Sequence, residues 1–503
     1  MRRFVFCFIL AASCHGREYP PPPVQWSVTR GENIAWKTTL PEGGQSAVTI
    51  HRNRVFTTMH RPISETDSKD EPNIVGLCLD AKTGDILWQV DLPGSDPKVK
   101  MAGIFSDATT FAPIADGDRV WFFNRCGSMG CFKIEDGERV WLREFQPRPR
   151  HTNRQCEPIL TGDLILTVEV KDKEAGQKLQ RHKPVPEGID PRDVWTYLHA
   201  IDKDNGEIRW IGEAGTSVHN TPVPGALPDG TLAVAHGRGG GHGPLERPYG
   251  VSLTRVSDGK PIWTTDLGKC EASFQSHWNG TRVFWWQGPN HLVLDAKNGT
   301  LLKTQNACEG VDFCRFDPKS GKWSMETDAK VKVRKMPLTN QTNLLVDDWH
   351  WFLAHEEIAV GRVNWKTGKT EYLQLPAQML PSPQSREKDQ LVWEKKDATP
   401  GDTRNSRGID VGELDKRSKG AGWGHVSAAM PARVGDFLLF PVMNGTVYVL
   451  KATPEKLDES ALVAINDLGP AGRTWSLSAI TFDPVSAHLF ARTMKEVICI
   501  GQK

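Results

Sequence analysis

The chain repeats a short motif made of a strand, a glycine turn and a second strand that usually ends in tryptophan. The copies are LDAKTGDILW (79–88), IEDGERVW (134–141), IDKDNGEIRW (201–210), VSDGKPIW (256–263), LDAKNGTLLK (294–303) and VNWKTGKTEY (363–372). In every copy the last residue lies four positions after the turn glycine. A motif that returns at a fixed internal spacing restricts the chain to a repeat architecture, because each copy must form the same local unit.

Each part of the motif has a physical role. The alternating apolar residues before the turn predict a strand, and Asp or Asn followed by glycine suits a tight hairpin turn. A tryptophan on the following strand can bury its ring between neighbouring sheets while its N–H donates to a carbonyl. The chain has 18 Trp against 5 Tyr, as expected if tryptophan fills a repeating structural position. We expect this role for Trp36, Trp88, Trp141, Trp210, Trp263 and Tyr372.

Two further strands are predicted before each motif, for example QSAVTI (45–50) and RVFTTM (54–59). Four antiparallel strands per unit are typical of a β-propeller blade. Two more units, at 427–467 and 474–501, bring the number of blades to eight, but the last unit lacks its tryptophan strand. The segment 32–40 is a tryptophan strand with no unit before it. The sequence therefore predicts an all-β, eight-bladed propeller of four-stranded antiparallel blades, closed by an N-terminal strand that joins the last blade.

The N-terminal residues MRRFVFCFILAASCHG (1–16) are typical of an export signal, with two arginines before a short apolar run and small residues after it. The alternative is an unstructured or wrongly assigned start. The run is too short to span a membrane as a helix, and we expect no transmembrane segment. We predict a signal peptide at 1–16, a proline-rich linker at 17–30 and the propeller at 31–503. The protein would be exported, periplasmic or envelope-associated, with Cys14 as a candidate lipid anchor because the residues before it loosely resemble a lipoprotein cleavage box.

Charge and cysteine content narrow the functional classes. Lys+Arg 62 against Asp+Glu 61 gives a formal net charge of +1, which argues against a nucleic-acid-binding protein. In an exported chain, Cys126 with Cys131 and Cys308 with Cys314 are spaced for local disulfides. Zinc is the alternative for these pairs, but neither has the usual ligand spacing. We therefore expect no metal site.

The repeat LDAKTGDILW, the small-residue first strands and the terminal RTMKEVICIG (492–501) resemble the pyrroloquinoline-quinone-like (PQQ-like) propeller repeat family. The opening segment 26–56 resembles exported bacterial members of that family. The family includes eight-bladed quinoprotein alcohol dehydrogenases and non-enzymatic relatives such as an outer-membrane assembly lipoprotein. The resemblance implies that the enzymes hold a quinone and Ca²⁺ beneath a disulfide between adjacent cysteines, and this chain has no adjacent cysteines. We expect no cofactor, with PQQ and Ca²⁺ as the alternative.

The long insertions predict where ligands would bind. In a propeller, the link between the second and third strands lies on the same face as the link between blades. The insertions at 60–73, 171–193, 236–248, 305–336 and 381–420 all fall in such links, and loops on a rigid scaffold commonly carry function. The candidate ligand residues at the channel mouth are His219, Asn220, His236, Arg238, His242, Gln275, Asn340, His425 and Trp475.

Two interpretations of these candidates stay open. In the first, the residues are polar only because a propeller axis contacts water and needs a polar lining. In the second, they form a pocket for a small polar ligand or a peptide. Likewise, HGRGGGHG (236–243) is either a flexible loop for a metal or an anion, or a closely packed segment that needs glycine.

The favoured function is an exported, non-catalytic and monomeric scaffold that binds an envelope protein, a peptide or a glycan. One alternative is a PQQ-dependent oxidoreductase. Another is a hydrolase or lyase that would need His219, His242 and His425 to lie together. No catalytic residue is assigned.

Overall fold

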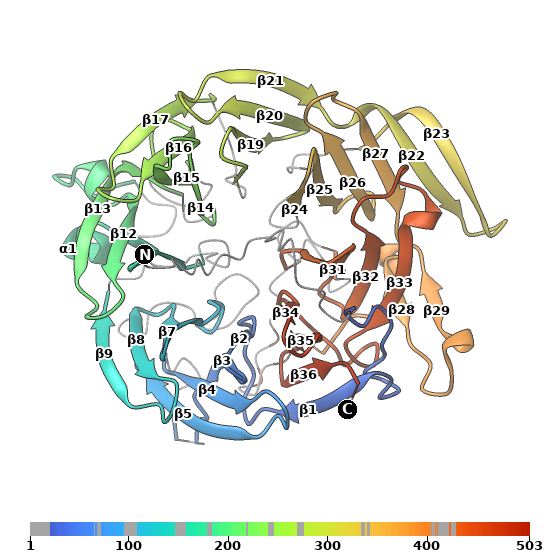
Figure 1. Ribbon diagram of the computed structural model, residues 1–503, viewed down its shortest axis with the longest axis horizontal. Helices are drawn as coiled ribbons and strands as arrows, with labels where there is room; N and C mark the ends of the chain where they lie inside the picture. The colour runs from blue at the N-terminus through green and yellow to red at the C-terminus, as the bar shows by residue number, and fades with distance from the viewer. Residues whose placement is uncertain are drawn as a thin grey trace.

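The structure is a computed structural model. It describes residues 21–502 except 65, 68–71, 95–107, 146–156, 179–183, 218–219, 240–245, 269–275, 333–337, 340–342, 403, 405–407, 409, 411–421 and 424–428. Eight antiparallel sheets surround a central axis, and the first strand of each blade lies innermost (Figure 1). The predicted eight-bladed, all-β architecture is confirmed.

The first four blades follow one another along the chain. Blade 1 contains β2 (Thr49–His51), β3 (Arg54–His60), β4 (Ile74–Asp80) and β5 (Ile86–Leu92). Blade 2 contains β6 (Ile114–Asp116), β7 (Arg119–Asn124), β8 (Ser128–Lys133) and β9 (Arg139–Glu144). Blade 3 contains β10 (Ile159–Thr161), β11 (Leu164–Val170), β12 (Thr196–Asp202) and β13 (Ile208–Gly215). Blade 4 contains β14 (Val223–Ala226), β15 (Leu232–Arg238), β16 (Gly250–Arg255) and β17 (Pro261–Asp266).

The other four blades complete the ring. Blade 5 contains β18 (His277–Trp278), β19 (Arg282–Gln287), β20 (Asn290–Asp295) and β21 (Leu301–Asn306). Blade 6 contains β24 (Asn343–Val346), β25 (Trp349–Ala354), β26 (Ala359–Asn364) and β27 (Thr370–Gln374). Blade 7 contains β30 (Ala432–Val434), β31 (Phe437–Pro441), β32 (Thr446–Lys451) and β33 (Leu462–Asp467). Blade 8 contains β34 (Thr481–Asp483), β35 (His488–Arg492), β36 (Glu496–Ile500) and β1 (Ile34–Thr39).

The N-terminal strand closes the ring, as predicted. β1 pairs antiparallel with β36, and Trp36 lies opposite Cys499. The Trp36 ring also packs edge-on against Phe490 of β35, with 5.9 Å between ring centroids. Because the first strand of the propeller and the last one share a sheet, the two ends of the chain hold each other in place.

The repeated tryptophans join each blade to the next one. In five blades the indole Nε1 donates to the carbonyl three residues before the turn glycine of the following blade. These bonds are Trp36 to Ala81 (2.9 Å), Trp88 to Ile134 (3.1 Å), Trp141 to Lys203 (3.0 Å), Trp210 to Val256 (2.9 Å) and Trp263 to Ala296 (2.8 Å). The motif is therefore an inter-blade anchor, in which each ring covers the turn of its neighbour.

The turn glycine is required on two grounds, as Gly299 shows. Its φ of +74° is unfavourable for residues with a side chain. A Cβ at this position would lie 2.6 Å from the Trp263 ring, closer than van der Waals contact allows. The same residue thus makes the tight turn and leaves room for the tryptophan of the preceding blade.

The segment before β1 packs against blades 7 and 8. Trp26 is fully buried among their apolar side chains, and its backbone N–H donates to Asn466 Oδ1 at 3.1 Å. Thr29 N and Oγ1 both donate to Asp467 Oδ1, at 2.9 and 2.8 Å. The described part of the expected 17–30 linker is thus attached to the propeller from Val24 onward. The expected signal peptide at 1–16 lies outside the described residues.

Two hairpins and a few short helices complete the structure. β22 (Glu309–Asp317) and β23 (Lys322–Lys330) form one hairpin, and β28 (Gln378–Leu380) and β29 (Gln390–Val392) form the other. In the described residues helix is limited to α1 (Lys173–Lys178) and single 3-10 turns at Pro191–Asp193, Arg386–Lys388, Lys395–Asp397 and Glu459–Ala461.

Candidate functional site

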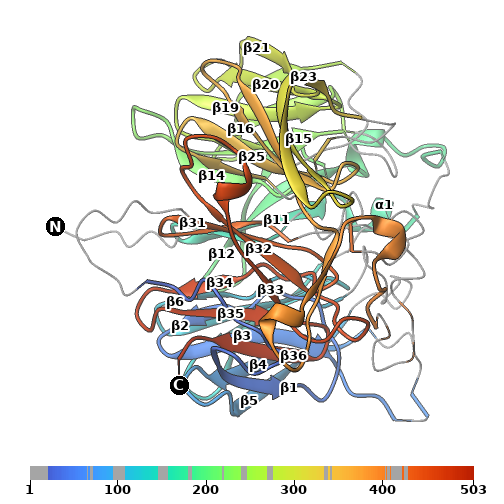
Figure 2. The ribbon, with the colours of Figure 1, turned by 90° about the vertical axis from the view of Figure 1, so that its right-hand side faces the viewer.

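The two ends of the ring differ in the length of their links. At one end, which we call the plain face, the links between first and second strands and between third and fourth strands have at most five residues, apart from 452–461. The other end, the elaborated face, carries the long links, including 61–73, 171–195, 239–249, 307–342 and 375–431. Helix α1 lies on the elaborated face, toward the right in Figure 2.

The link between blades 5 and 6 forms a hairpin that the sequence pattern did not predict. β22 and β23 pair with each other, and β22 then adds in parallel to β27, so blade 6 becomes a six-stranded sheet. Aromatic rings join this hairpin to the next link: Phe316 stacks on Trp393 with 4.0 Å between centroids, and Trp323 packs edge-on against Trp393 at 5.7 Å. The two hairpins form an arm outside the ring (Figure 1).

His236 and Arg238 lie in strand β15 rather than in a glycine loop. His236 is fully buried and its Nε2 is 2.8 Å from Thr254 Oγ1. Burial, together with the nearby charge of Arg238, lowers the pKa of His236 to about 3, so the ring is neutral. A Cβ at the intervening Gly237 would lie 2.4 Å from the Trp285 ring. In this part of the segment, glycine therefore permits close packing.

Arg238 is held by the chain that follows it. Its Nε donates to Pro248 O at 2.9 Å, and its Nη2 donates to Arg247 O. Burial lowers the pKa of Arg238, while the charge of Glu246 opposes this change. Glu246 is itself buried and accepts from Thr196 Oγ1 at 3.1 Å. A buried cation and a buried carboxylate thus lie together beneath the elaborated face of blades 3 and 4.

Asn220 belongs to the same group, whereas Trp475 does not. Asn220 Oδ1 accepts from Gly237 N at 2.7 Å, so Asn220, His236 and Arg238 come together in blade 4. Trp475 is buried before blade 8, where it packs with Met443 and Leu477. The other five candidates lie outside the described residues: His219, His242, Gln275, Asn340 and His425. The three histidines of the hydrolase hypothesis, His219, His242 and His425, are all among these five residues.

The expected local disulfides are not formed. Cys126 packs with Phe122 and Phe132, whereas Cys131 packs with Trp121 and Met129 on the other side of blade 2. Cys308 and Cys314 are likewise assigned to separate clusters on the two sides of blade 6. The spacing is correct for a bridge across a turn, but in each pair one cysteine lies in a turn and the other in a strand, Cys131 in β8 and Cys314 in β22, and the two thiols pack into different apolar clusters.

Sequence reasoning missed several buried charges between blades. The guanidinium of Arg143 in blade 2 forms a bidentate salt bridge with the carboxylate of Glu169 in blade 3, with N–O distances of 2.8 and 2.7 Å. Burial alone would raise the pKa of Glu169, but the charges of His199 and Arg143 and the hydrogen bonds lower it overall. No motif spacing connects these residues, because they become neighbours only when two blades pack together.

Among the described residues, no group of three or more His, Cys, Asp or Glu side chains is arranged to hold a metal ion. No helix in the described part of the chain is long and apolar enough to cross a membrane.

Comparison with known proteins supports the resemblance to PQQ-like propellers. Residues 24–173 and 69–211 match the family model described as outer membrane protein assembly factor BamB. No curated protein sequence matches the chain.

Solved structures align with the chain at low sequence identity. BamB from Moraxella catarrhalis is 10% identical, with a TM-score of 0.47 over 93% of this chain and 98% of that one. A europium-containing methanol dehydrogenase is 11% identical, with a TM-score of 0.50 over 91% of this chain and 84% of that one. Quinohemoprotein alcohol dehydrogenase from Comamonas testosteroni is 12% identical, with a TM-score of 0.51 over 95% of this chain and 78% of that one. At these identities the structural similarity concerns the fold alone.

Proposed function

We propose that this PQQ-like β-propeller is an exported, non-catalytic scaffold that binds a protein partner in the cell envelope through its elaborated face. The match of residues 24–211 to the family model of an outer membrane assembly factor supports a binding role. Export, and Cys14 as a lipid anchor, are parts of the same proposal. A peptide or a glycan is the alternative partner.

The observation that carries the proposal is the difference between the two faces. The eight blades, five of which are joined to the next by an indole hydrogen bond, form a rigid support, and nearly all the variation in link length is on one end of it. Loops on a rigid scaffold can change to fit a partner without disturbing the core. The short turns of the plain face, by contrast, already accept hydrogen bonds from the tryptophans of neighbouring blades.

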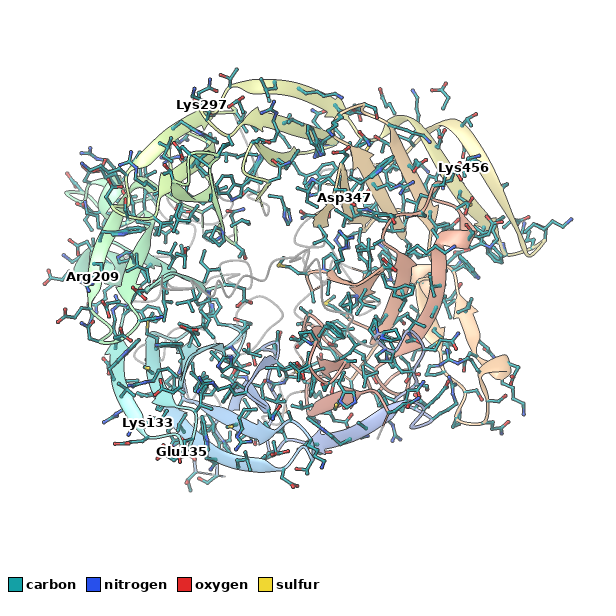
Figure 3. The ribbon with its side chains drawn as sticks, viewed as in Figure 1. Lys133, Glu135, Arg209, Lys297, Asp347 and Lys456 are labelled. Carbon is teal, nitrogen blue, oxygen red and sulfur yellow. The ribbon has the colours of Figure 1, made fainter. Side chains whose placement is uncertain are left out.

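Site-specific photocrosslinking tests which face binds. We expect a photoreactive residue at Lys173 of α1 or at Glu187, both exposed on the elaborated face, to give discrete crosslinks in intact cells. Matched positions on the plain face are Glu135 and Lys297, which are exposed and project outward from the rim (Figure 3). These should give none. Equal crosslinking from both faces, or crosslinks from Glu135 and Lys297 alone, would contradict the proposal.

The alternative is a PQQ-dependent oxidoreductase. Ca²⁺ requires several oxygen ligands, and the described residues show no cluster of acidic side chains to provide them. We therefore do not include a quinone–Ca²⁺ site in the proposal.

We accordingly expect purified protein mixed with PQQ and Ca²⁺ to bind no stoichiometric quinone and to keep its melting temperature. Absorbance after gel filtration and a thermal melt measure both quantities, with Ca²⁺ alone as the control. Bound quinone at one equivalent, with a higher melting temperature, would favour the oxidoreductase instead.

A further inference from the structure

Three buried histidines meet between blades 5 and 6. His291 Nε2 of β20 lies 2.9 Å from His350 Nδ1 of β25, so the two blades are joined by a histidine–histidine hydrogen bond. The His277 ring of β18 packs edge-on against His350, with 5.2 Å between centroids. All three side chains are at least nine-tenths buried. We call these residues, with Lys303, the 5/6 seam.

The repeat shows that the histidines are exceptional at their positions. His350 pairs with Val363 in the ladder between second and third strands. The corresponding position of every other blade is apolar and fully buried: Val55, Val120, Ile165, Val234, Val283, Leu438 and Leu489. His291 pairs with Trp286. Its counterparts are also apolar: Gly76, Met129, Leu198, Val251, Val360, Val447 and Val497.

The same seam lacks the tryptophan anchor. The repeat position that holds tryptophan in blade 4 holds Lys303 in blade 5, and its Nζ donates to Lys366 O at 3.2 Å. A flexible lysine replaces a rigid ring, so less apolar surface holds blade 5 to blade 6 here than at the preceding seams. Three departures from the repeat therefore coincide at one junction.

The hydrogen bonds fix where the protons lie. His350 Nε2 is 2.9 Å from Asn343 Oδ1, which can only accept, so Nε2 carries the proton. His350 Nδ1 is then the acceptor, and His291 Nε2–H donates to it. Protonation of His350 would place two N–H groups against each other across 2.9 Å. The closed seam therefore requires a neutral His350.

Among the described residues no carboxylate acts on the three rings to offset an added charge, although hydrogen bonds with Asn343 partly oppose the lowering of the pKa of His277 by burial. Phe284 and Trp286 pack against the rings of His291 and His350. The groups that act on the rings are the other histidines, the amide of Asn343 and the cation of Lys303; Asp348 at the end of the seam is paired with Lys366. Burial lowers the pKa of His277 to about 4 and of His291 to about 3, and it lowers the pKa of His350 well below the usual range.

We propose that the 5/6 seam is an acid-sensitive joint, which neutral His291 and His350 hold closed and which opens locally when they take up protons. The opened state binds more protons than the closed one, so opening becomes more favourable as pH falls below the ordinary histidine pKa of about 6.5. Between pH 7 and pH 5 the opening equilibrium should rise about 25-fold for each histidine that is protonated.

Hydrogen exchange of the intact protein at pH 7 and pH 5, corrected for intrinsic exchange rates, tests the joint. We expect the protection factors of amides in β19, β20 and β25 to fall several hundred-fold from pH 7 to pH 5. The protection factors of amides in β3, β4, β7 and β8 should fall much less. The variant His291→Val with His350→Leu introduces residues found at these positions in other blades. It should abolish the extra loss at pH 5.

Equal loss of protection in blades 1 and 5 of the wild-type protein would overturn the proposal, and this comparison does not depend on the variant. The proposal also fails if the double variant folds and keeps the wild-type pH dependence.

Discussion

Replacing Trp263 by alanine is expected to lower the free energy of unfolding by about 3–5 kcal/mol. Trp263 is 8% exposed and packs with apolar side chains of blades 4 and 5, including Leu253 and Leu294. Its removal would leave a cavity, expose the turn of the next blade and deprive Ala296 O of its indole donor. Urea unfolding followed by far-ultraviolet circular dichroism, which reports on the backbone rather than on tryptophan, measures the loss of stability.

Two further variants separate the contribution of the indole hydrogen bond from that of the packing of the ring. Trp263→Phe retains part of the ring but removes the N–H, and should cost about 1–3 kcal/mol, the range for a buried group left without its partner. Lys303→Ala, at the same repeat position of blade 5, should change stability by less than about 0.5 kcal/mol because the side chain is only partly buried and has no aromatic ring to pack. If Lys303→Ala costs as much as Trp263→Ala, the repeat position does not act through indole packing.

The fold could be predicted from the sequence because its information is local and repeated. The interval from turn glycine to tryptophan requires both a tight turn and a ring that reaches the neighbouring turn, as Gly299 and Trp263 show. The isolated Trp36 strand identified the closing strand because an eight-bladed ring has one place for it. Each inference needed only the pattern within one unit or a count of the strands in successive units.

The functional site was harder to predict because its contacts join distant segments. The β22–β23 hairpin lacks the repeated motif, and its addition to β27 depends on an exposed sheet edge. The cysteine spacing indicated disulfides, but the packing of the folded blades determines which apolar cluster each thiol joins. His291 and His350 become informative only after the blades are aligned by their hydrogen-bond registers.

Arg362 is the second residue whose loss should be severe. It is 1% exposed, and its guanidinium lies over the Trp349 ring at 4.0 Å. Its Nε donates to Glu371 at 2.7 Å, and Nη1 donates to Pro454 O at 2.9 Å, so the side chain links blade 6 to the 452–461 link. Arg362→Ala should lower the free energy of unfolding by about 3–5 kcal/mol, because Glu371 would stay buried with one cation fewer.

The matched control is a solvent-accessible ion pair elsewhere in the ring. Arg255 pairs with Asp258 at 2.6 Å, their side chains are 41% and 35% exposed, and Arg255→Ala should cost only about 0.2–1 kcal/mol. Replacing both buried partners, Arg362→Met with Glu371→Leu, should recover most of the stability lost in Arg362→Ala, since no uncompensated charge remains. If the double variant is as unstable as Arg362→Ala, the loss comes from the contacts of Arg362 with Trp349 and Pro454 rather than from the unpaired carboxylate. Urea unfolding of the four proteins at one pH distinguishes these results.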